Sequence, residues 1–127
     1  MFTLKNLFIV NTLVAISYGL GALFSPAWIM STYGLTLNTA GELMTRFYGA
    51  ELLAHGWMTW NARNSLASDA RTAIVSARSI GNAIRAMVAI AFMLSGQANW
   101  RGYNIVGIFA FFALTYGYFW LTKKDKV

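Results

Sequence analysis

The chain consists of long apolar stretches separated by short polar ones, and two of the apolar stretches carry no charged residue. These two run from Asn6 to Phe24 and from Gly102 to Leu121. About 20 residues at ~1.5 Å rise each are enough for a helix to cross the hydrocarbon core of a bilayer. Both stretches are therefore predicted to be membrane-spanning helices.

Two further helices are predicted between these, over residues 39–62 and 69–96, and both contain charged residues. Thr39 and Glu42 have the spacing of a capping box at the start of the first, and Gly96 is a typical helix stop at the end of the second. Pro26 ends the first span and favours a short helix at the interface. The pattern predicts an all-α fold, a single domain over residues 1–127 built as an antiparallel bundle of four transmembrane helices.

Basic residues are distributed unequally between the two ends of such a bundle. One end holds both termini and the loop between the second and third spans, with Lys5, Arg63, Arg71, Lys123, Lys124 and Lys126, whereas the opposite loops hold only Arg101. Cytoplasmic loops carry an excess of Lys and Arg. We therefore expect a multi-pass protein of the inner (cytoplasmic) membrane with both termini in the cytoplasm, and the lipid bilayer as its first partner.

The composition agrees with a membrane location and excludes several kinds of site. Hydrophobic residues make up 57% of the chain and charged residues 11%, against roughly a quarter charged in soluble domains. The chain has no Cys and one His, so we expect no metal site and no cofactor. The dispersed basic residues predict no nucleic-acid partner. Trp28, Tyr33, Trp100 and Tyr103 are expected in an aromatic belt at the outer interface.

The second predicted span carries two kinds of charged residue. Glu42 and Arg46 are four residues apart near its start, and we predict a structural ion pair between them. Glu51 is twelve residues from Thr39, which places it ~18 Å along the helix, near the middle of the bilayer. A carboxylate at that depth needs neutralisation or a partner.

The third predicted span offers such a partner. Arg71, Arg78 and Arg85 recur every seven residues and form one stripe, which also includes Asn82. Because a short loop joins the second and third spans, we expect these spans to pack against each other antiparallel. A buried Glu51–Arg78 ion pair follows, with Arg85 or Asn82 close to it. Gly81 lies on this stripe too, and the small-residue series Ala73, Ala77 and Gly81 predicts a close helix contact, so the face is expected inside the bundle.

The charged residues in and around the outer half of the bundle have two interpretations. His55 is one turn from Glu51, and together they suit either a proton relay in transport or catalysis, or simple structural pairing. Arginines outnumber carboxylates here, so an anion, a lipid phosphate, backbone carbonyls or another subunit is needed. The candidate ligand or partner contact consists of Glu51, His55, Arg78, Asn82 and Arg85.

The stretches "SYGLGALFSPAWIMSTYGL" and "AGELMTRFYGAELLAHGWMTWNAR" resemble small bacterial inner-membrane proteins with four helices that are loosely similar to the DoxX-like group. The resemblance implies an R-x-x-G element, matched by Arg46 and Gly49, and a W-x-A-R element, matched from Trp60 to Arg63. The resemblance covers the first half of the chain. In the second half it rests on the number of helices. It implies no activity and assigns no role to Glu51 or His55.

Three classes of function are compatible with these patterns. The first is a non-enzymatic accessory or interaction subunit of a membrane complex, associated with other subunits or with further copies of itself. The alternative is a small transporter or binder of an anionic or lipid-like ligand that uses the intramembrane Arg, Glu and His residues. An enzyme ranks last because no catalytic arrangement is present in the sequence.

Overall fold

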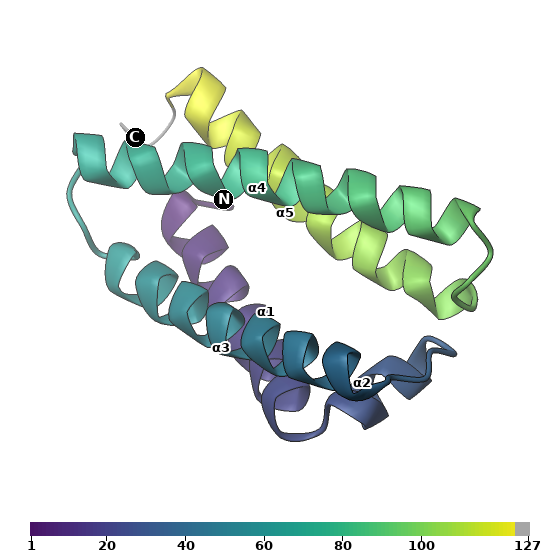
Figure 1. Ribbon diagram of the computed structural model, residues 1–127. Coiled ribbons are helices and arrows are strands. Elements are labelled where there is room, and N and C mark those ends of the chain that lie inside the picture. The colour runs from purple at the N-terminus through teal and green to yellow at the C-terminus, as the bar shows by residue number, and fades with distance from the viewer. Residues whose placement is uncertain (124–127) are drawn as a thin grey trace.

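The computed structural model describes residues 1–123 as helices joined by short connections, with no strand in that range (Figure 1). Lys124 and Lys126, which were predicted at the end rich in basic residues, lie outside the described residues. The helices are α1 (Leu4–Phe24), α2 (Pro26–Thr32), α3 (Thr39–Ala62), α4 (Asp69–Leu94), the short 3-10 helix η1 (Trp100–Gly102) and α5 (Tyr103–Thr122). The all-α class is confirmed.

Polar side chains fix where the long helices begin. Thr3, Asn38 and Ser68 each accept a hydrogen bond from a backbone N–H of the first turn, at α1, α3 and α4 respectively. Helix α3 is thus capped by Asn38, one residue before the predicted cap. Gly96 has a φ of 75° just after α4, the left-handed conformation that the predicted helix stop requires.

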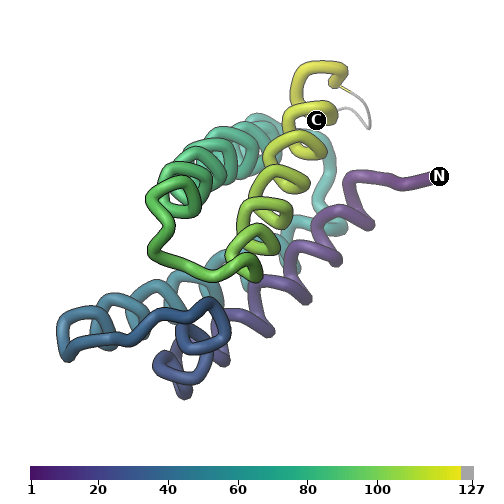
Figure 2. The backbone as a smooth tube through the Cα atoms, turned by 90° about the vertical axis from the view of Figure 1, so that its right-hand side faces the viewer, coloured from purple at the N-terminus to yellow at the C-terminus, as the bar shows by residue number. Residues whose placement is uncertain are grey.

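The long helices form two antiparallel hairpins. Helix α1 packs along α3, and α4 packs along α5, whereas α3 and α4 scarcely touch (Figures 1 and 2). The prediction that the second and third spans pack against each other is therefore wrong. Adjacency in the sequence brings only their ends together, at the loop between them.

Small residues decide this pairing. A Cβ on Gly49 would lie 2.6 Å from the backbone nitrogen of Leu23, and one on Gly19 would lie 3.0 Å from the carbonyl oxygen of Gly49. Backbones this close need glycine at the contact. The Thr12 and Thr59 hydroxyls are also hydrogen-bonded across it, at 2.8 Å, in a buried position. The first hairpin is therefore closely packed along its length.

The second hairpin has a different contact from the predicted one. The Ser79 hydroxyl donates to the carbonyl of Ala113 at 3.0 Å, and a Cβ on Gly117 would lie 3.0 Å from the same hydroxyl. Ala73 and Ala77 are exposed. The predicted stripe of small residues is therefore not the packing face of α4 in this chain.

The two hairpins are held together at the end where α1 begins and α5 ends. Buried side chains from all four long helices meet there: Leu4, Leu7, Phe8, Ala62, Val75, Phe112, Tyr116 and Phe119. Next to them the Tyr116 hydroxyl donates to Oδ1 of Asn11 at 3.1 Å, which joins α5 to α1. We call this region the terminal end.

At the opposite end, which we call the α2 end, the hairpins meet through a loop. Asn99 donates from its backbone N–H to the carbonyl of Tyr33 at 2.9 Å, and from its amide side chain to the carbonyl of Thr32 at 3.1 Å. Its Oδ1 also accepts the N–H of Arg101 at the start of η1. One residue thus ties the α4–α5 connection to the end of α2.

Three helical segments are long and apolar enough to cross a membrane: Leu4–Phe24, Asp69–Leu94 and Trp100–Thr122. The prediction was four. Helix α3 has the length, at 24 residues, but Glu42, Arg46, Glu51 and His55 interrupt it, so it contains no apolar stretch long enough to meet the same requirement.

Candidate ligand-binding cavity

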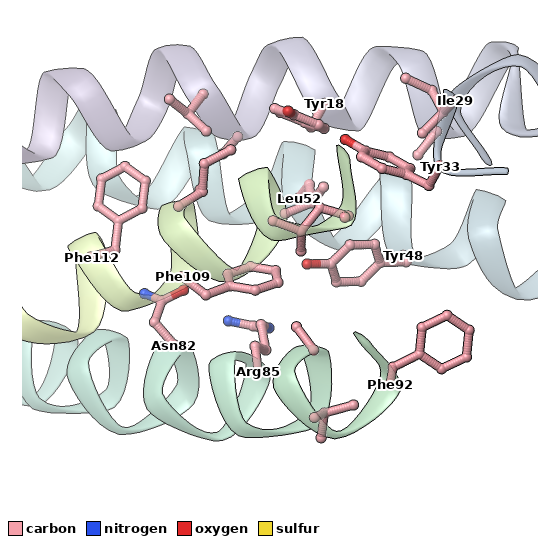
Figure 3. Close-up of a pocket in the computed structure, with 18 of the residues that line it drawn as sticks. Tyr18, Ile29, Tyr33, Tyr48, Leu52, Asn82, Arg85, Phe92, Phe109 and Phe112 are labelled. Carbon is pink, nitrogen blue, oxygen red and sulfur yellow. The ribbon is translucent and has the colours of Figure 1, made fainter. Parts of the chain in front are cut away.

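A cavity of about 420 Å³ lies between the two hairpins, next to the core of the terminal end (Figure 3). Side chains from α1, α2, α3, α4 and α5 line it, and most of them are aliphatic or aromatic. The volume falls in the range of sites that enclose small molecules. Residues far apart in the sequence therefore build one apolar chamber.

One wall of the cavity is polar, and it is the predicted stripe on α4. Arg78, Asn82 and Arg85 all line the cavity. Arg78 is 6% exposed and Asn82 is 1% exposed, while Arg85 is half-buried. The Asn82 amide donates to the backbone carbonyl of Arg78 at 2.7 Å, so its side chain is fixed along the helix. The prediction that this face is turned inward is therefore confirmed for Arg78, Asn82 and Arg85 only.

Arg78 is held in place by a residue of the neighbouring core, Tyr116. Its guanidinium lies within hydrogen-bonding reach of the Tyr116 hydroxyl, which in turn donates to Asn11. The Nε atom of Arg78 is buried and has no hydrogen-bond partner among the described residues. Arg78 is therefore positioned by protein groups without being fully satisfied by them.

Arg85 lies in a different setting from Arg78. Its side chain reaches from α4 toward the middle of the cavity, where Tyr48 of α3 and Phe109 of α5 lie opposite it (Figure 3). No carboxylate within residues 1–123 forms an ion pair with it. A guanidinium in a mostly apolar cavity is costly unless a negative or polar group meets it.

Three tyrosines line the side of the cavity opposite α4: Tyr18, Tyr33 and Tyr48. Tyr18 and Tyr33 are hydrogen-bonded to each other, and burial together with this bond raises the pKa of Tyr33 above its ordinary value. Tyr33 was predicted in the aromatic belt, yet it is 6% exposed. The turn after α2 folds it inward, so it closes the cavity instead of anchoring the chain at the interface.

Two of the predicted site residues do not line the cavity. Glu51 is exposed, and the predicted Glu51–Arg78 ion pair is wrong, because Arg78 turns to Tyr116. His55 is half-buried, with Nδ1 lacking a partner among the described residues, and the charged groups around it include Arg78, Arg85 and Glu51. The proposed pairing failed because α3 faces α1, which turns Glu51 outward.

The predicted Glu42–Arg46 ion pair is also wrong. Nη1 of Arg46 donates to the carbonyl oxygen of Leu23, in the last turn of α1. Carbonyls at a helix end have no partner within the helix, so the guanidinium satisfies one of them. Gly49, in the same R-x-x-G element, contacts the backbone of that turn. This element therefore joins α3 to the end of α1 and has no part in the cavity.

The sequence alone missed Asn11, Tyr18 and Tyr48, which also line the cavity. Asn11 and Tyr18 are seven residues apart on α1, the same spacing as Arg78 and Arg85 on α4. Such spacing places two residues on nearly one face of a helix. The signal was present, but an isolated Asn or Tyr in an apolar helix carries less weight than an Arg.

Comparison with known proteins identifies the family. A family profile described as a domain of unknown function, DUF8292, matches residues 2–122. The chain belongs to the DUF8292 family. No curated protein and no solved structure matches the chain. The resemblance to DoxX-like proteins is not tested by the DUF8292 match and stays a prediction.

The set of ligating groups limits the chemistry of the cavity. Within residues 1–123, no group of three or more His, Cys, Asp or Glu side chains is placed to hold a metal ion. The polar groups that line the cavity are guanidinium, amide and phenol groups, which recognise anions and hydrogen-bond acceptors. The cavity therefore places guanidinium, amide and phenol groups beside apolar walls.

Proposed function

We propose that the protein crosses the bacterial inner membrane four times, with α3 as the fourth span and both termini in the cytoplasm. The support is geometric. The start of α1, the end of α5 and the α3–α4 loop lie at one end of the molecule, and α2 and the α4–α5 connection lie at the other (Figure 1). Lys5, Arg63 and Arg71 belong to the first end and Arg101 to the second, as the positive-inside rule requires.

Single-cysteine labelling tests this topology, because the chain has no Cys of its own. Ser65→Cys lies in the α3–α4 loop and Gln97→Cys in the α4–α5 connection. In intact cells, a membrane-impermeant maleimide is expected to label Q97C and to leave S65C unlabelled until the membrane is opened. Labelling of both from outside would contradict the four-span topology.

We further propose that the cavity binds an amphipathic, lipid-like anion. One observation carries this proposal: Arg85 reaches into a largely apolar cavity, where no carboxylate of the described chain pairs with it. Arg78 adds a second guanidinium, with a buried Nε that has no partner among the described residues. An anionic ligand would compensate these charges, while its apolar part would contact the aliphatic and aromatic walls.

Extraction of the protein from its native membrane into lipid nanodiscs, followed by native mass spectrometry, tests the proposal. We expect the wild type to retain an anionic amphiphile in stoichiometric amount and Arg85→Gln to lose it. Arg101→Gln is the matched control, because Arg101 is an exposed arginine outside the cavity. Equal retention by all three proteins would overturn the proposal.

A second candidate, an accessory subunit of a membrane complex, rests on Glu51. This carboxylate is exposed on α3, ~18 Å from the start of the helix. If α3 spans the membrane, Glu51 faces lipid at mid-depth, where a charged group needs a partner from another chain or a second copy. Glu51→Gln is expected to release such a partner during purification. If no partner co-purifies with the wild type, this candidate fails.

A further inference from the structure

We infer that the ligand is a small carboxylic acid with an apolar body, held with its carboxylate on Arg85 and its apolar body toward the α2 end. This inference rests on the proposed binding function and narrows it. It depends on three properties of the cavity: its closure at the α2 end, the depth of its charged wall, and the charge available to neutralise a headgroup.

The α2 end of the cavity is apolar and covered. Ile29, Met30 and Leu35 line it from the α2 region, and Ile105 lines it from α5. The two hydrogen bonds from Asn99 to the backbone of residues 32 and 33 hold this cover in place. The apolar part of a ligand would therefore contact apolar side chains at this end.

The charged wall lies well below that end. Arg85 is nine residues before the end of α4 at Leu94, or ~14 Å along the helix axis. A bilayer phospholipid keeps its headgroup at the membrane surface, so its phosphate would not reach Arg85 while its chains remain in the leaflet. A ligand that pairs with Arg85 is instead taken up whole, and the volume of about 420 Å³ limits it to a small molecule.

Two guanidiniums line this wall, and one of them is free to hold a headgroup. Arg78 is engaged with Tyr116, so Arg85 is the guanidinium whose planar fork is available for a headgroup. A carboxylate carries one charge and accepts two parallel hydrogen bonds from a guanidinium. A phosphate monoester presents three acceptor oxygens, and the single fork of Arg85 satisfies two of them, which leaves the third without a partner in an apolar cavity.

A carboxylic acid also has a route through lipid that a phosphate lacks. With a pKa of about 4.3 in water, a carboxylic acid keeps a neutral fraction of about 1 in 500 at pH 7, and this neutral form is the one that crosses the apolar region. The acid loses its proton at the membrane surface: the carboxyl O–H bond breaks, the electron pair stays on the oxygen, the proton passes to interfacial water, and the carboxylate is then held by Arg85.

Titration of three ligands with the same chain tests the inference: decanoate, decyl phosphate and decanol. The full-length protein is placed in neutral phosphatidylcholine nanodiscs, and heats of binding are corrected with empty nanodiscs. We expect saturable binding of decanoate, weaker binding of decyl phosphate and the weakest of decanol. Arg85→Gln should weaken decanoate binding by roughly 10- to 100-fold, the loss of one charged hydrogen-bonded contact. Arg101→Gln should leave it unchanged.

The outcomes separate this inference from the proposed function. Tighter binding of decyl phosphate than of decanoate would overturn the carboxylic acid and leave anion binding intact. Failure of both anions to bind more tightly than decanol would overturn the proposed function as well. Ala89→Phe fills the cavity while keeping Arg85, so it provides a second test if R85Q does not fold. The Ala89→Phe variant is also expected to abolish decanoate binding. Undiminished binding would contradict the claim that decanoate binds in the cavity.

Discussion

The two ends of the space between the hairpins are built from the same helices but are filled differently. At the terminal end, large side chains such as Phe8 and Phe119 are fully buried against one another. Toward the α2 end, small residues such as Ala22 and Ala89 line a cavity, and Arg85 projects into it. The comparison teaches that cohesion between the hairpins comes mainly from one end, which leaves the other available for a ligand.

The largest difference in stability between the two ends is expected when one phenylalanine of α5 is replaced at each of them. Phe119 is 3% exposed in the core, whereas Phe109 lines the cavity. Phe119→Ala should lower the free energy of unfolding by roughly 3 kcal/mol, because it leaves a void between packed helices. Phe109→Ala should lower the free energy of unfolding by less than about 1 kcal/mol, because Phe109 already borders a cavity. Reversible unfolding in mixed micelles measures both, and equal losses would show that the two ends are packed alike.

A smaller effect is expected from adding a methyl group at the contact inside the first hairpin. Gly49→Ala forces a Cβ against the backbone of α1, and we expect a loss of about 2 kcal/mol. Gly107→Ala is the control, since a Cβ there meets nothing within 4 Å. Its free energy of unfolding should not decrease. A tolerated G49A would mean that the α1–α3 contact is looser than described.

Arg78 lies at the boundary between the two ends, and its replacement sharpens the comparison. Arg78→Met should stabilise the ligand-free protein by about 1 kcal/mol, because a desolvated cation without a carboxylate partner is replaced by an apolar side chain of similar length. Thermal unfolding in detergent measures the change. A loss of more than about 2 kcal/mol would instead assign Arg78 to the packed core through Tyr116.

The smallest effect is expected at the cover of the α2 end. Asn99→Ala removes the side-chain bond to the carbonyl of Thr32 and the cap on the N–H of Arg101, but it keeps the backbone bond to Tyr33. We expect a loss of about 0.5–1 kcal/mol. Hydrogen exchange should accelerate in α2 and remain unchanged at the terminal end. Faster exchange at both ends would mean that the two regions are not independent.

Much of the fold followed from the sequence, because membrane helices are marked by local features. The apolar runs predicted α1 and α5, and the capping residues and Gly96 bounded α3 and α4 to within a few residues. Which helices pack against each other could not be predicted from the sequence. It depends on a match between Gly19 and Gly49, which lie on different helices, and no local pattern links those two positions.

The candidate site could be predicted from the sequence in part, for the same reason. The seven-residue spacing of Arg78 and Arg85 is local to α4, so the inward face was predicted correctly. Glu51 was matched with Arg78 by depth alone, but its direction depends on which neighbour α3 packs against. Tyr33 was assigned to the outer interface by its position between the first two predicted spans, and only the tertiary fold buries it.

The most direct test of the cavity as a ligand site is fluorine NMR on two single-cysteine variants carrying a trifluoromethyl tag. Ala89→Cys lies in the cavity wall, and Ala54→Cys lies on the exposed face of α3. On titration with decanoate in nanodiscs, the tag at position 89 should shift saturably, the tag at position 54 should stay constant, and Arg85→Gln should abolish the shift. Parallel, unsaturable drift of both signals would mean that the amphiphile only partitions into the lipid, which would contradict a binding site between the hairpins.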